Sequence, residues 1–394
     1  MLSSRAVTCD IFCTVIDNFG DIGVCWRLAR QLAVEHGWQI RLFVDDLHTF
    51  QKLCPAVCMD TDTATQTVEG IVIAPWRKET SRTSYAVIDA PPEIADVVIE
   101  AFACDLPHAY VAAMAQRKRQ PVWLNLEYLS AEAWVADFHL KPSPHPRHAL
   151  TKTFFFPGFT AGTGGVLKER DLDAARSAFE NSPAARAAWW RNATGESPPG
   201  ADATVISLFA YENPALGSLL AQWCNAPAPV VLLVPQGRIS GAIARYFGLL
   251  SFDAGARAQR GMLRAYGLPF TDQRGYDPLL WASDVNFVRG EDSFVRAQWA
   301  ARPFVWHSYP QADDAHLPKL DAMLERYAQP LPAAACMALH RFWHAWNGHG
   351  TPDWNDFARH IPALRQRAVS WAAELAQAGD LAANLAGFAQ SQLK

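Results

Sequence analysis

Apolar residues alternate with polar turns along the first half of the chain in a pattern that predicts buried strands separated by helices. The run from residue 6 to residue 16 is mostly apolar and predicts a strand of a parallel sheet. Apolar residues then recur at helical spacing from Val24 to Val34, and Gly37 is a typical helix stop. Further strands are predicted at 39–44, 68–73, 85–90, 96–103 and 121–126, with a helix at 108–119.

A second alternating series of strands and helices begins at residue 204. Its predicted strands are 204–211, 229–234, 284–288 and 303–306, and its predicted helices are 215–224, 241–247 and 292–301. Residues 181–203, between the two series, are rich in Ala, Ser, Pro and Gly and are interpreted as a linker. The proline-rich stretch 141–146 and the residues 154–165 are interpreted as loops. From 315 to 393 the periodicity is helical, and the last helix, 361–382, is expected to cross back to the first domain.

Strands that alternate with helices indicate right-handed crossovers and parallel sheets. The prediction is therefore an α/β protein with two Rossmann-like, doubly wound domains that face each other across a cleft. This is the GT-B architecture, in which the second domain usually holds a nucleotide sugar. The expected boundaries are 1–180 for an acceptor-binding domain, joined by a C-terminal helix at about 362–394, and 181–361 for a nucleotide-sugar-binding domain.

Composition and charge agree with a packed enzyme. The chain has 394 residues, of which 50% are hydrophobic and 19% are charged, enough for two globular domains. A net charge of −4 argues against a dedicated nucleic-acid binder. No apolar run approaches the roughly 20 residues that span a bilayer, and Asp10 interrupts the N-terminal apolar stretch, which argues against a signal peptide. The eight cysteines contain no Cys-x-x-Cys pair, as is typical of a reduced cytoplasmic protein.

The turn after the first strand carries two carboxylates, Asp17 and Asp21, and two glycines, Gly20 and Gly23. In parallel α/β sheets the ligand crevice lies outside the carboxyl ends of the strands, so both aspartates are candidates for chemistry. Glycine lets the backbone turn tightly and approach a ligand closely. The alternative is structural: Asp21 caps the helix and Asp17 stabilises the turn. The turn lacks a full Gly-x-Gly-x-x-Gly, which argues against an NAD site.

A second turn suited to an anion follows the strand 284–288. The chain continues through Arg289 and Ser293 into a helix whose N-terminus favours negative charge. A diphosphate would find hydroxyl and guanidinium donors here. The alternative is that Asp292 and Ser293 are ordinary caps. The role of Glu291 is open, because a carboxylate repels a diphosphate.

Glu127 and the sequence Asp60-Thr-Asp62 are further acidic candidates for a functional site. Glu127 lies at the end of a predicted strand, where it would contact an acceptor or cap its own loop. The Asp60-Thr-Asp62 sequence is similar to a metal-binding Asp-x-Asp motif, but its polar surroundings favour solvated side chains. Since the cysteines also lack zinc-site spacing, no metal is expected.

Five motifs together resemble one family, the bacterial protein-arginine rhamnosyltransferases that modify elongation factor P. They occur in order along nearly the whole chain: Val15–Val24, Trp123–Leu129, Phe154–Phe159, Phe209–Asn213 and Asn286–Ser293. The resemblance implies an inverting, metal-independent transfer of L-rhamnose from dTDP-β-L-rhamnose to a guanidine nitrogen of one arginine of elongation factor P. It implies no cofactor, no direct nucleic-acid contact, no membrane and a cytoplasmic location.

The same resemblance assigns residues to roles. Asp21 is the general base, and Asp17 is a second essential carboxylate that orients the acceptor or supports the base. Phe270 stacks on thymine and Gln273 bonds its edge, within a donor site formed by Phe209, Tyr211, Phe270, Gln273, Arg289, Glu291, Asp292, Ser293 and Tyr309. Apart from the resemblance, a protein acceptor requires surface contacts on the first domain, where Asn125, Glu127 and the loop around Phe159 are candidates.

Elementary chemistry agrees with a carboxylate base. An arginine side chain is cationic and its nitrogen lone pairs are delocalised, so it attacks poorly until a base accepts a proton as the new bond forms. Two alternatives remain from the sequence. One is a GT-B glycosyltransferase with a small-molecule or lipid-linked acceptor, and the other is a noncatalytic Rossmann-type binding protein.

Overall fold

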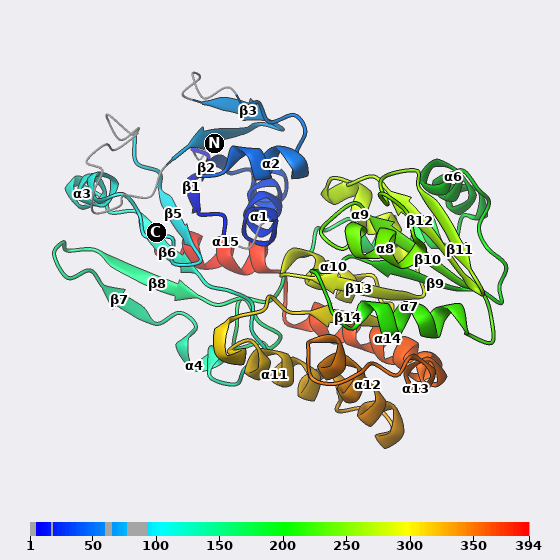
Figure 1. Cartoon of the computed structure of the whole chain (residues 1–394). Coiled ribbons are helices and arrows are strands. Elements are labelled where there is room, and N and C mark those ends of the chain that lie inside the picture. Colours follow the sequence, from blue (N-terminus) through cyan, green and yellow to red (C-terminus); the bar gives the residue numbers. More distant parts are fainter. Residues whose placement is uncertain (1–4, 17–18, 60–64, 77–92, 394) are drawn as a thin grey trace. The chain divides into compact units, whose positions relative to one another are not determined.

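The computed structural model describes residues 5–16, 19–59, 65–76 and 93–393, and Figure 1 draws the chain. It contains two compact units: unit 1 is Met1–Arg170 with Leu375–Lys394, and unit 2 is Asp171–Glu374. The sequence suggested divisions at 180/181 and 361/362, whereas the structure divides the chain at 170/171 and 374/375. The helix before residue 180 falls in unit 2 because it packs on two other helices of that unit. Within the described ranges, no helix is long and apolar enough to span a bilayer.

Unit 1 is built on an eight-stranded sheet with the order β3-β4-β2-β1-β5-β6-β8-β7. The six inner strands run parallel to one another, and each of the two edge strands, β3 and β7, is antiparallel to its neighbour. The strands are β1 (Thr8–Cys13), β2 (Gln39–Val44), β3 (Gln66–Val68), β4 (Ile71–Pro75), β5 (Val97–Ala101), β6 (Val122–Leu126), β7 (Pro142–Pro144) and β8 (Thr151–Phe155). The helices are α1 (Gly20–His36), α2 (Leu47–Leu53), α3 (His108–Gln116), α4 (Val135–Phe138) and α15 (Leu381–Gln392).

The core of unit 1 follows from the apolar runs that predicted its strands. Phe12 of β1 stacks on Phe43 of β2 at 4.3 Å between ring centroids, and Tyr110 of α3 meets Phe12 edge-on. Helix α1 ends where the sequence predicted, because Gly37 adopts a left-handed conformation with φ of 68°. The strand predicted at 39–44 is confirmed. The strand predicted at 85–90 lies outside the described residues.

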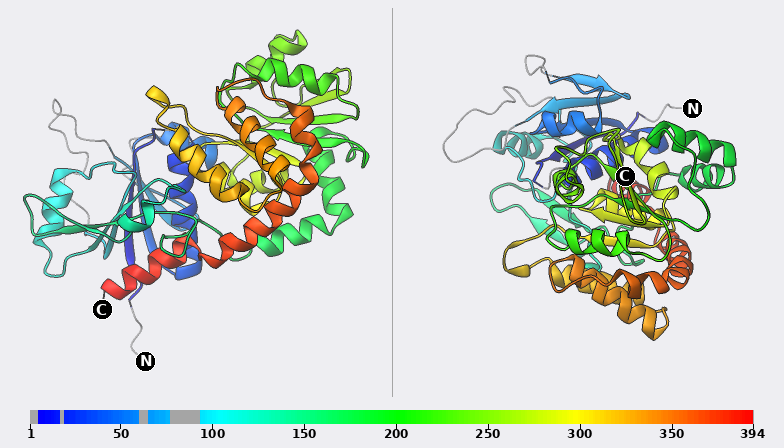
Figure 2. Two further views of the ribbon diagram at one scale, coloured as in Figure 1. Left: turned by 90° about the horizontal axis from the view of Figure 1, so that it is seen from below. Right: turned by 45° about the vertical axis from the view of Figure 1, so that its right-hand side comes forward.

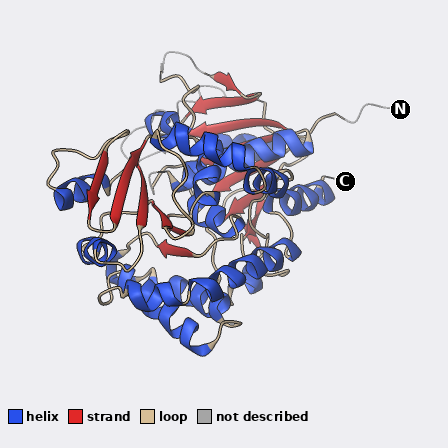
Figure 3. Cartoon of the chain, turned by 90° about the vertical axis from the view of Figure 1, so that its right-hand side faces the viewer, coloured by secondary structure: helices blue, strands red, loops and turns tan. Residues whose placement is uncertain are grey.

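Unit 2 is built on a six-stranded sheet with the order β11-β12-β10-β9-β13-β14. All neighbours are parallel except the edge strand β11. The strands are β9 (Thr204–Leu208), β10 (Val230–Pro235), β11 (Arg257–Arg260), β12 (Leu263–Leu268), β13 (Val285–Arg289) and β14 (Phe304–His307). The helices are α5 (Leu172–Glu180), α6 (Pro183–Thr194), α7 (Leu216–Cys224), α8 (Ser240–Phe247), α9 (Gln273–Trp281), α10 (Asp292–Trp299), α11 (Leu317–Ala328), α12 (Ala333–Trp346), α13 (Trp354–Arg359) and α14 (Ile361–Gln377). Figure 3 shows helices flanking the strands in both units.

Several sequence predictions are wrong in detail. The expected linker 181–203 contains α6, a helix of 12 residues. The expected loops at 141–146 and 154–165 contain β7 and the end of β8. The predicted strand 68–73 is instead an antiparallel hairpin, β3 and β4, that turns at Glu69 and Gly70.

The C-terminal helix returns to the first unit, as the sequence predicted, but as a separate helix. The expected helix 361–382 ends at Gln377, and α15 begins at Leu381 after Gly379, whose φ is 83°. Helix α15 belongs to unit 1 and packs on α1 (Figure 2). The α/β class and the two parallel sheets are therefore confirmed.

Candidate active site

Asp21 is held rigidly in the turn between β1 and α1. It is the second residue of α1 and is 1% exposed, and its Oδ2 accepts a hydrogen bond of 2.7 Å from the backbone amide of Ile16. The N-cap residue is Phe19, which makes no capping side-chain bond. The N-cap position is therefore Phe19 and not Asp21, whose carboxylate accepts an amide of the segment before the helix. Asp17 lies outside the described residues.

Asn125 and Glu127 lie at the same edge of the unit 1 sheet as Asp21. They are at the carboxyl end of β6, and only β5 separates β6 from β1 in the sheet. Asn125 is fully buried and its Nδ2 donates to Glu127 Oε1. Burial raises the pKa of Glu127, while Asn125, the Lys152 ammonium and the Tyr128 amide favour its ionised form. The contact with the Tyr128 amide means that Glu127 also supports its own loop.

A buried ion pair lies beside these residues and was not predicted from the sequence. Glu100 of β5 is 1% exposed, and Lys152 of β8 donates to its two carboxylate oxygens at 3.1 and 3.2 Å. Trp123 Nε1 donates to the same carboxylate at 3.2 Å, and the ammonium lies 5.4 Å from the Trp123 ring centroid. A glutamate inside the apolar strand Val97–Ala101 was the available signal, because a buried charge requires a partner.

In unit 2, the predicted donor residues gather at the carboxyl ends of strands. Phe209 and Tyr211 follow β9, Phe270 and Gln273 follow β12, Arg289 ends β13, and Tyr309 follows β14. Ligands of open parallel sheets bind at this edge. The structure therefore places these residues at one edge of one sheet.

Arg289 is the centre of an aromatic cluster in unit 2. Its guanidinium carbon lies 4.5 Å from the ring centroid of Phe209 and 4.6 Å from that of Tyr211. Tyr309, which is 42% exposed, meets Tyr211 edge-on at 5.6 Å. Arg289 itself is 6% exposed, so two aromatic faces fix the plane of its guanidinium.

The start of α10 adds polar groups next to Arg289. The N-cap residue is Glu291, whose side chain makes no capping bond. Asp292 accepts a hydrogen bond of 3.1 Å from Gln273 Nε2, and Ser293 Oγ bonds the backbone amide and carbonyl of Arg289. The N-cap position of α10 is Glu291, so Asp292 and Ser293 are the first two residues of the helix. The helix dipole favours an anion at this end.

His307 contacts Tyr211 of this cluster, and the sequence did not predict it as a site residue. It ends β14, in register with Arg289 of β13, and its ring lies 5.2 Å from that of Tyr211. Burial and the Arg289 charge lower the pKa of His307 to about 3. The imidazole is therefore neutral at physiological pH and adds no charge to the cluster.

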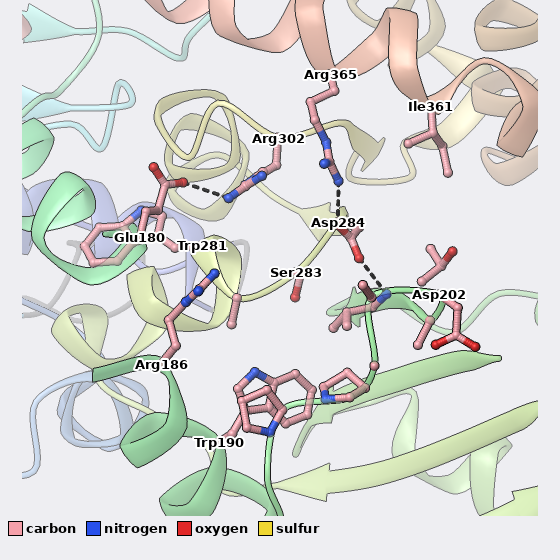
Figure 4. Close-up of a pocket in the computed structure, with 18 of the residues that line it drawn as sticks. Glu180, Arg186, Trp190, Asp202, Trp281, Ser283, Asp284, Arg302, Ile361 and Arg365 are labelled. Carbon is pink, nitrogen blue, oxygen red and sulfur yellow. Dashed lines mark hydrogen bonds and ion pairs between the residues drawn. The ribbon is translucent and has the colours of Figure 1, made fainter. Parts of the chain in front are cut away.

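A cavity of about 680 Å³ lies at the opposite, amino-terminal edge of the unit 2 sheet (Figure 4). Its lining includes Thr204 at the start of β9 and Asp284 just before β13, and it includes none of the predicted donor residues. Arg302 pairs with Glu180 at 2.8 Å, and Arg365 of α14 pairs with Asp284. These ion pairs fasten α5 and α14 to the strand ends.

One group of side chains in the described part of the chain has its possible metal-ligating atoms close together, Glu35, His36 and Asp380. It lies at the end of α1 remote from Asp21. Glu35 Oε1 accepts the Arg170 amide, and Asp380 caps α15, so both carboxylates already have structural partners. Asp60 and Asp62 lie outside the described residues.

Comparison with known proteins decides the family. A model of the family described as elongation factor P (EF-P) rhamnosyltransferase EarP matches residues 9–390. The chain belongs to the EarP family. Protein-arginine rhamnosyltransferases of Pseudomonas putida and Pseudomonas aeruginosa are 47% and 46% identical to it over 391 and 386 residues. These alignments cover 98% and 96% of this chain and 99% and 98% of the relatives.

Solved structures agree with membership of the EarP family. One that describes EarP-mediated arginine glycosylation of translation elongation factor EF-P is 36% identical, with a TM-score of 0.67, and covers 98% of this chain and 99% of its own. Acinetobacter baumannii MurG, at 12% identity and a TM-score of 0.52, covers 98% of this chain and 100% of its own and shares only the fold. The GT-B fold, the glycosyltransferase class and the predicted family are confirmed, and the noncatalytic alternative is wrong.

Proposed function

We propose that this chain transfers L-rhamnose from dTDP-β-L-rhamnose to a guanidine nitrogen of one arginine of elongation factor P, with inversion at the anomeric carbon. The observation that carries the proposal is the family match over residues 9–390. Elongation factor P is the acceptor in the work on the related EarP structure. Because that acceptor is a translation factor, we place the reaction in the cytoplasm.

Unit 2 is proposed to hold the donor. Phe270 stacks on thymine, and Gln273 hydrogen-bonds its edge. Arg289, Ser293 and the start of α10 stabilise the diphosphate, with Phe209, Tyr211, Glu291, Asp292 and Tyr309 completing the site. The supporting geometry is the guanidinium of Arg289, fixed between two rings beside a helix N-terminus. Preorganised positive charge at the leaving diphosphate lowers the barrier without further rearrangement.

Unit 1 is proposed to hold the acceptor arginine and the base. Asn125, Glu127 and Asp17 orient the guanidinium, and Asp21 accepts its proton. The guanidine nitrogen attacks the anomeric carbon while the bond from that carbon to the diphosphate oxygen breaks, and dTDP leaves on the opposite face. One proton passes to Asp21 as the carbon–nitrogen bond forms, which is general-base catalysis. The transition state has oxocarbenium character, as in inverting glycoside hydrolysis.

We propose that this transfer uses neither a metal ion nor a cofactor. The negative charge on the leaving dTDP is met by Arg289 and the dipole of α10, which occupy the place that a cation takes in metal-dependent transferases. Addition of EDTA should therefore leave the rate of transfer unchanged.

The test is the intact mass of elongation factor P after incubation with this protein and dTDP-β-L-rhamnose. Gain of one deoxyhexose by native elongation factor P, and none by a variant whose acceptor arginine is replaced by lysine, is expected. dTDP-glucose in place of the donor keeps the nucleotide and serves as a control for sugar choice. An unmodified mass under conditions in which dTDP still binds would overturn the protein acceptor and favour a small-molecule or lipid-linked one.

A further inference from the structure

Four polar or aromatic side chains of unit 1 lie on one face of the sheet, next to the proposed acceptor contact. Glu100 of β5 is in register with Asn125 of β6, and Trp123 of β6 is in register with Lys152 of β8. Residues two apart on a strand point to the same face, so Trp123, Asn125 and Glu127 share it. The three strands thus bring Glu100 and Lys152 to the side of the sheet from which Glu127 projects.

The side chains of Glu100, Trp123, Asn125, Glu127 and Lys152 form a row across the three strands, and their charges do not sum to zero. Glu100 and Glu127 are two carboxylates, and the ammonium of Lys152, which pairs with Glu100, also favours the ionised form of Glu127. Lys152 is committed to Glu100, with contacts of 3.1 and 3.2 Å to its two oxygens, and its ammonium lies over the Trp123 ring. Trp123 Nε1 fixes the Glu100 carboxylate from a second direction. The row therefore carries one negative charge in excess, and the structure places it at Glu127.

We propose that Glu100 is a positioning residue for the acceptor: by holding Lys152, it keeps the ammonium away from Glu127 and leaves that carboxylate for a cationic side chain. This inference rests on the proposed contact between Glu127 and the acceptor arginine. One excess negative charge matches one guanidinium, so the row also selects for a cationic acceptor over a neutral one.

Removal of Glu100 should redirect Lys152. The lysine has a flexible four-carbon stem, and after Glu100→Gln it can turn to the Glu127 carboxylate, on which its charge already acts. A lysine paired with Glu127 competes with the acceptor guanidinium for the same oxygens. Removal of Lys152 together with Glu100 takes away the competitor and restores the single excess negative charge, so the double variant should regain what the single variant loses.

The experiment measures KM for elongation factor P and kcat with saturating dTDP-β-L-rhamnose. E100Q should raise KM by about tenfold, with a change of less than about threefold in kcat. E100Q/K152M should return KM to within about threefold of the native value, and E100D, which keeps the charge, should stay near it. If Glu100 had only a structural role, E100Q/K152M should be more impaired than E100Q in folding and in kcat, because both partners of the ion pair would be lost.

The outcomes separate this inference from the function on which it rests. E127Q should raise KM, and an unchanged KM for E127Q would show that the acceptor role of Glu127 is wrong. A raised KM for E127Q with a native KM for E100Q would overturn the positioning role alone. If E100Q does not fold, the double variant still decides, because a KM raised about tenfold in a folded E100Q/K152M protein contradicts the inference.

Discussion

Single residues set the charge distribution of the donor site, and Arg289 illustrates how. The sequence predicted this arginine because it follows a buried strand and precedes a helix. It did not predict that Phe209 and Tyr211 would enclose the guanidinium at 4.5 and 4.6 Å, since that contact joins the ends of two strands about 80 positions apart. The stack matters because a planar cation held in place needs no reorganisation when it meets a diphosphate.

Arg289→Lys should therefore weaken dTDP binding by about tenfold, or ~1.4 kcal/mol, although the charge is kept. Lysine cannot stack between two rings or offer a forked pair of donors. Isothermal titration with dTDP measures the effect. Arg359→Lys, on the exposed side chain of α13 that pairs with Asp356, is the matched control and should bind dTDP normally. Equal affinities for both variants would show that the stack is irrelevant to the donor.

His307 makes stability depend on pH. Its pKa is about 3 in the folded protein and near 6.5 when unfolded, so the unfolded chain binds the extra proton between these values. The free energy of unfolding should then fall as the pH drops below about 6.5, by about 2 kcal/mol at pH 5 relative to pH 8. Urea unfolding at both pH values should show that His307→Gln loses this part of the pH dependence. His48→Gln, at an exposed position of α2, should retain it.

At the scale of elements, the predictions succeeded where apolar periodicity was strong and failed where composition was used instead. Residues 181–203 are rich in Ala, Ser, Pro and Gly, a composition that predicts a linker. The capping signals of α6 were nevertheless present: Ser182 accepts the Ala185 amide, Pro183 is the first helical residue, and Gly195 ends the helix with φ of 75°. The edge hairpin β11–β12 was missed because β11 is polar and four residues long.

The break between α14 and α15 is an element-scale feature with a testable cause. Asp380 receives the amides of Ala382 and Ala383 at 3.2 and 2.8 Å, and also that of Lys168 at 3.2 Å. It therefore caps α15 and joins that helix to the segment before unit 2. The sequence pattern continued through this point because Leu381 and Leu385 keep the apolar spacing, so only the turn residues marked the break.

Asp380→Ala should lower the free energy of unfolding by about 1–2 kcal/mol, because two helix amides and one loop amide lose their acceptor. Asp380→Asn should cost less than Asp380→Ala, because its one side-chain oxygen still accepts part of these amide hydrogen bonds and the carboxylate whose pKa burial has raised is removed. Urea denaturation compares both with Asp253→Ala, at an exposed loop position. Equal losses for Asn and Ala would show that the charge, and not the cap, holds α15.

At the scale of the whole molecule, unit 1 is proposed to bind the acceptor and unit 2 the donor. Unit 1 provides Asp21, Asn125 and Glu127 at the carboxyl ends of its strands, and unit 2 provides the aromatic and cationic residues at the carboxyl ends of its own. Alternating strands and helices were enough to predict both sheets and to place Asp21 and Arg289 after strands. The Glu100–Lys152 pair and His307 were missed, because they become neighbours of the site only through pairing of strands distant in the sequence.

The proposed general base is in unit 1 and the proposed donor-binding residues are in unit 2, so a substitution of the base should leave donor binding unchanged. Asp21→Asn keeps the hydrogen bond from the Ile16 amide through its side-chain oxygen but cannot accept the arginine proton. The most direct test measures transfer of L-rhamnose to elongation factor P by this variant, beside titration of the same preparation with dTDP. The rate should fall by about 10²–10⁴-fold while the affinity for dTDP stays native. A near-native rate would contradict the assignment of Asp21 as the base.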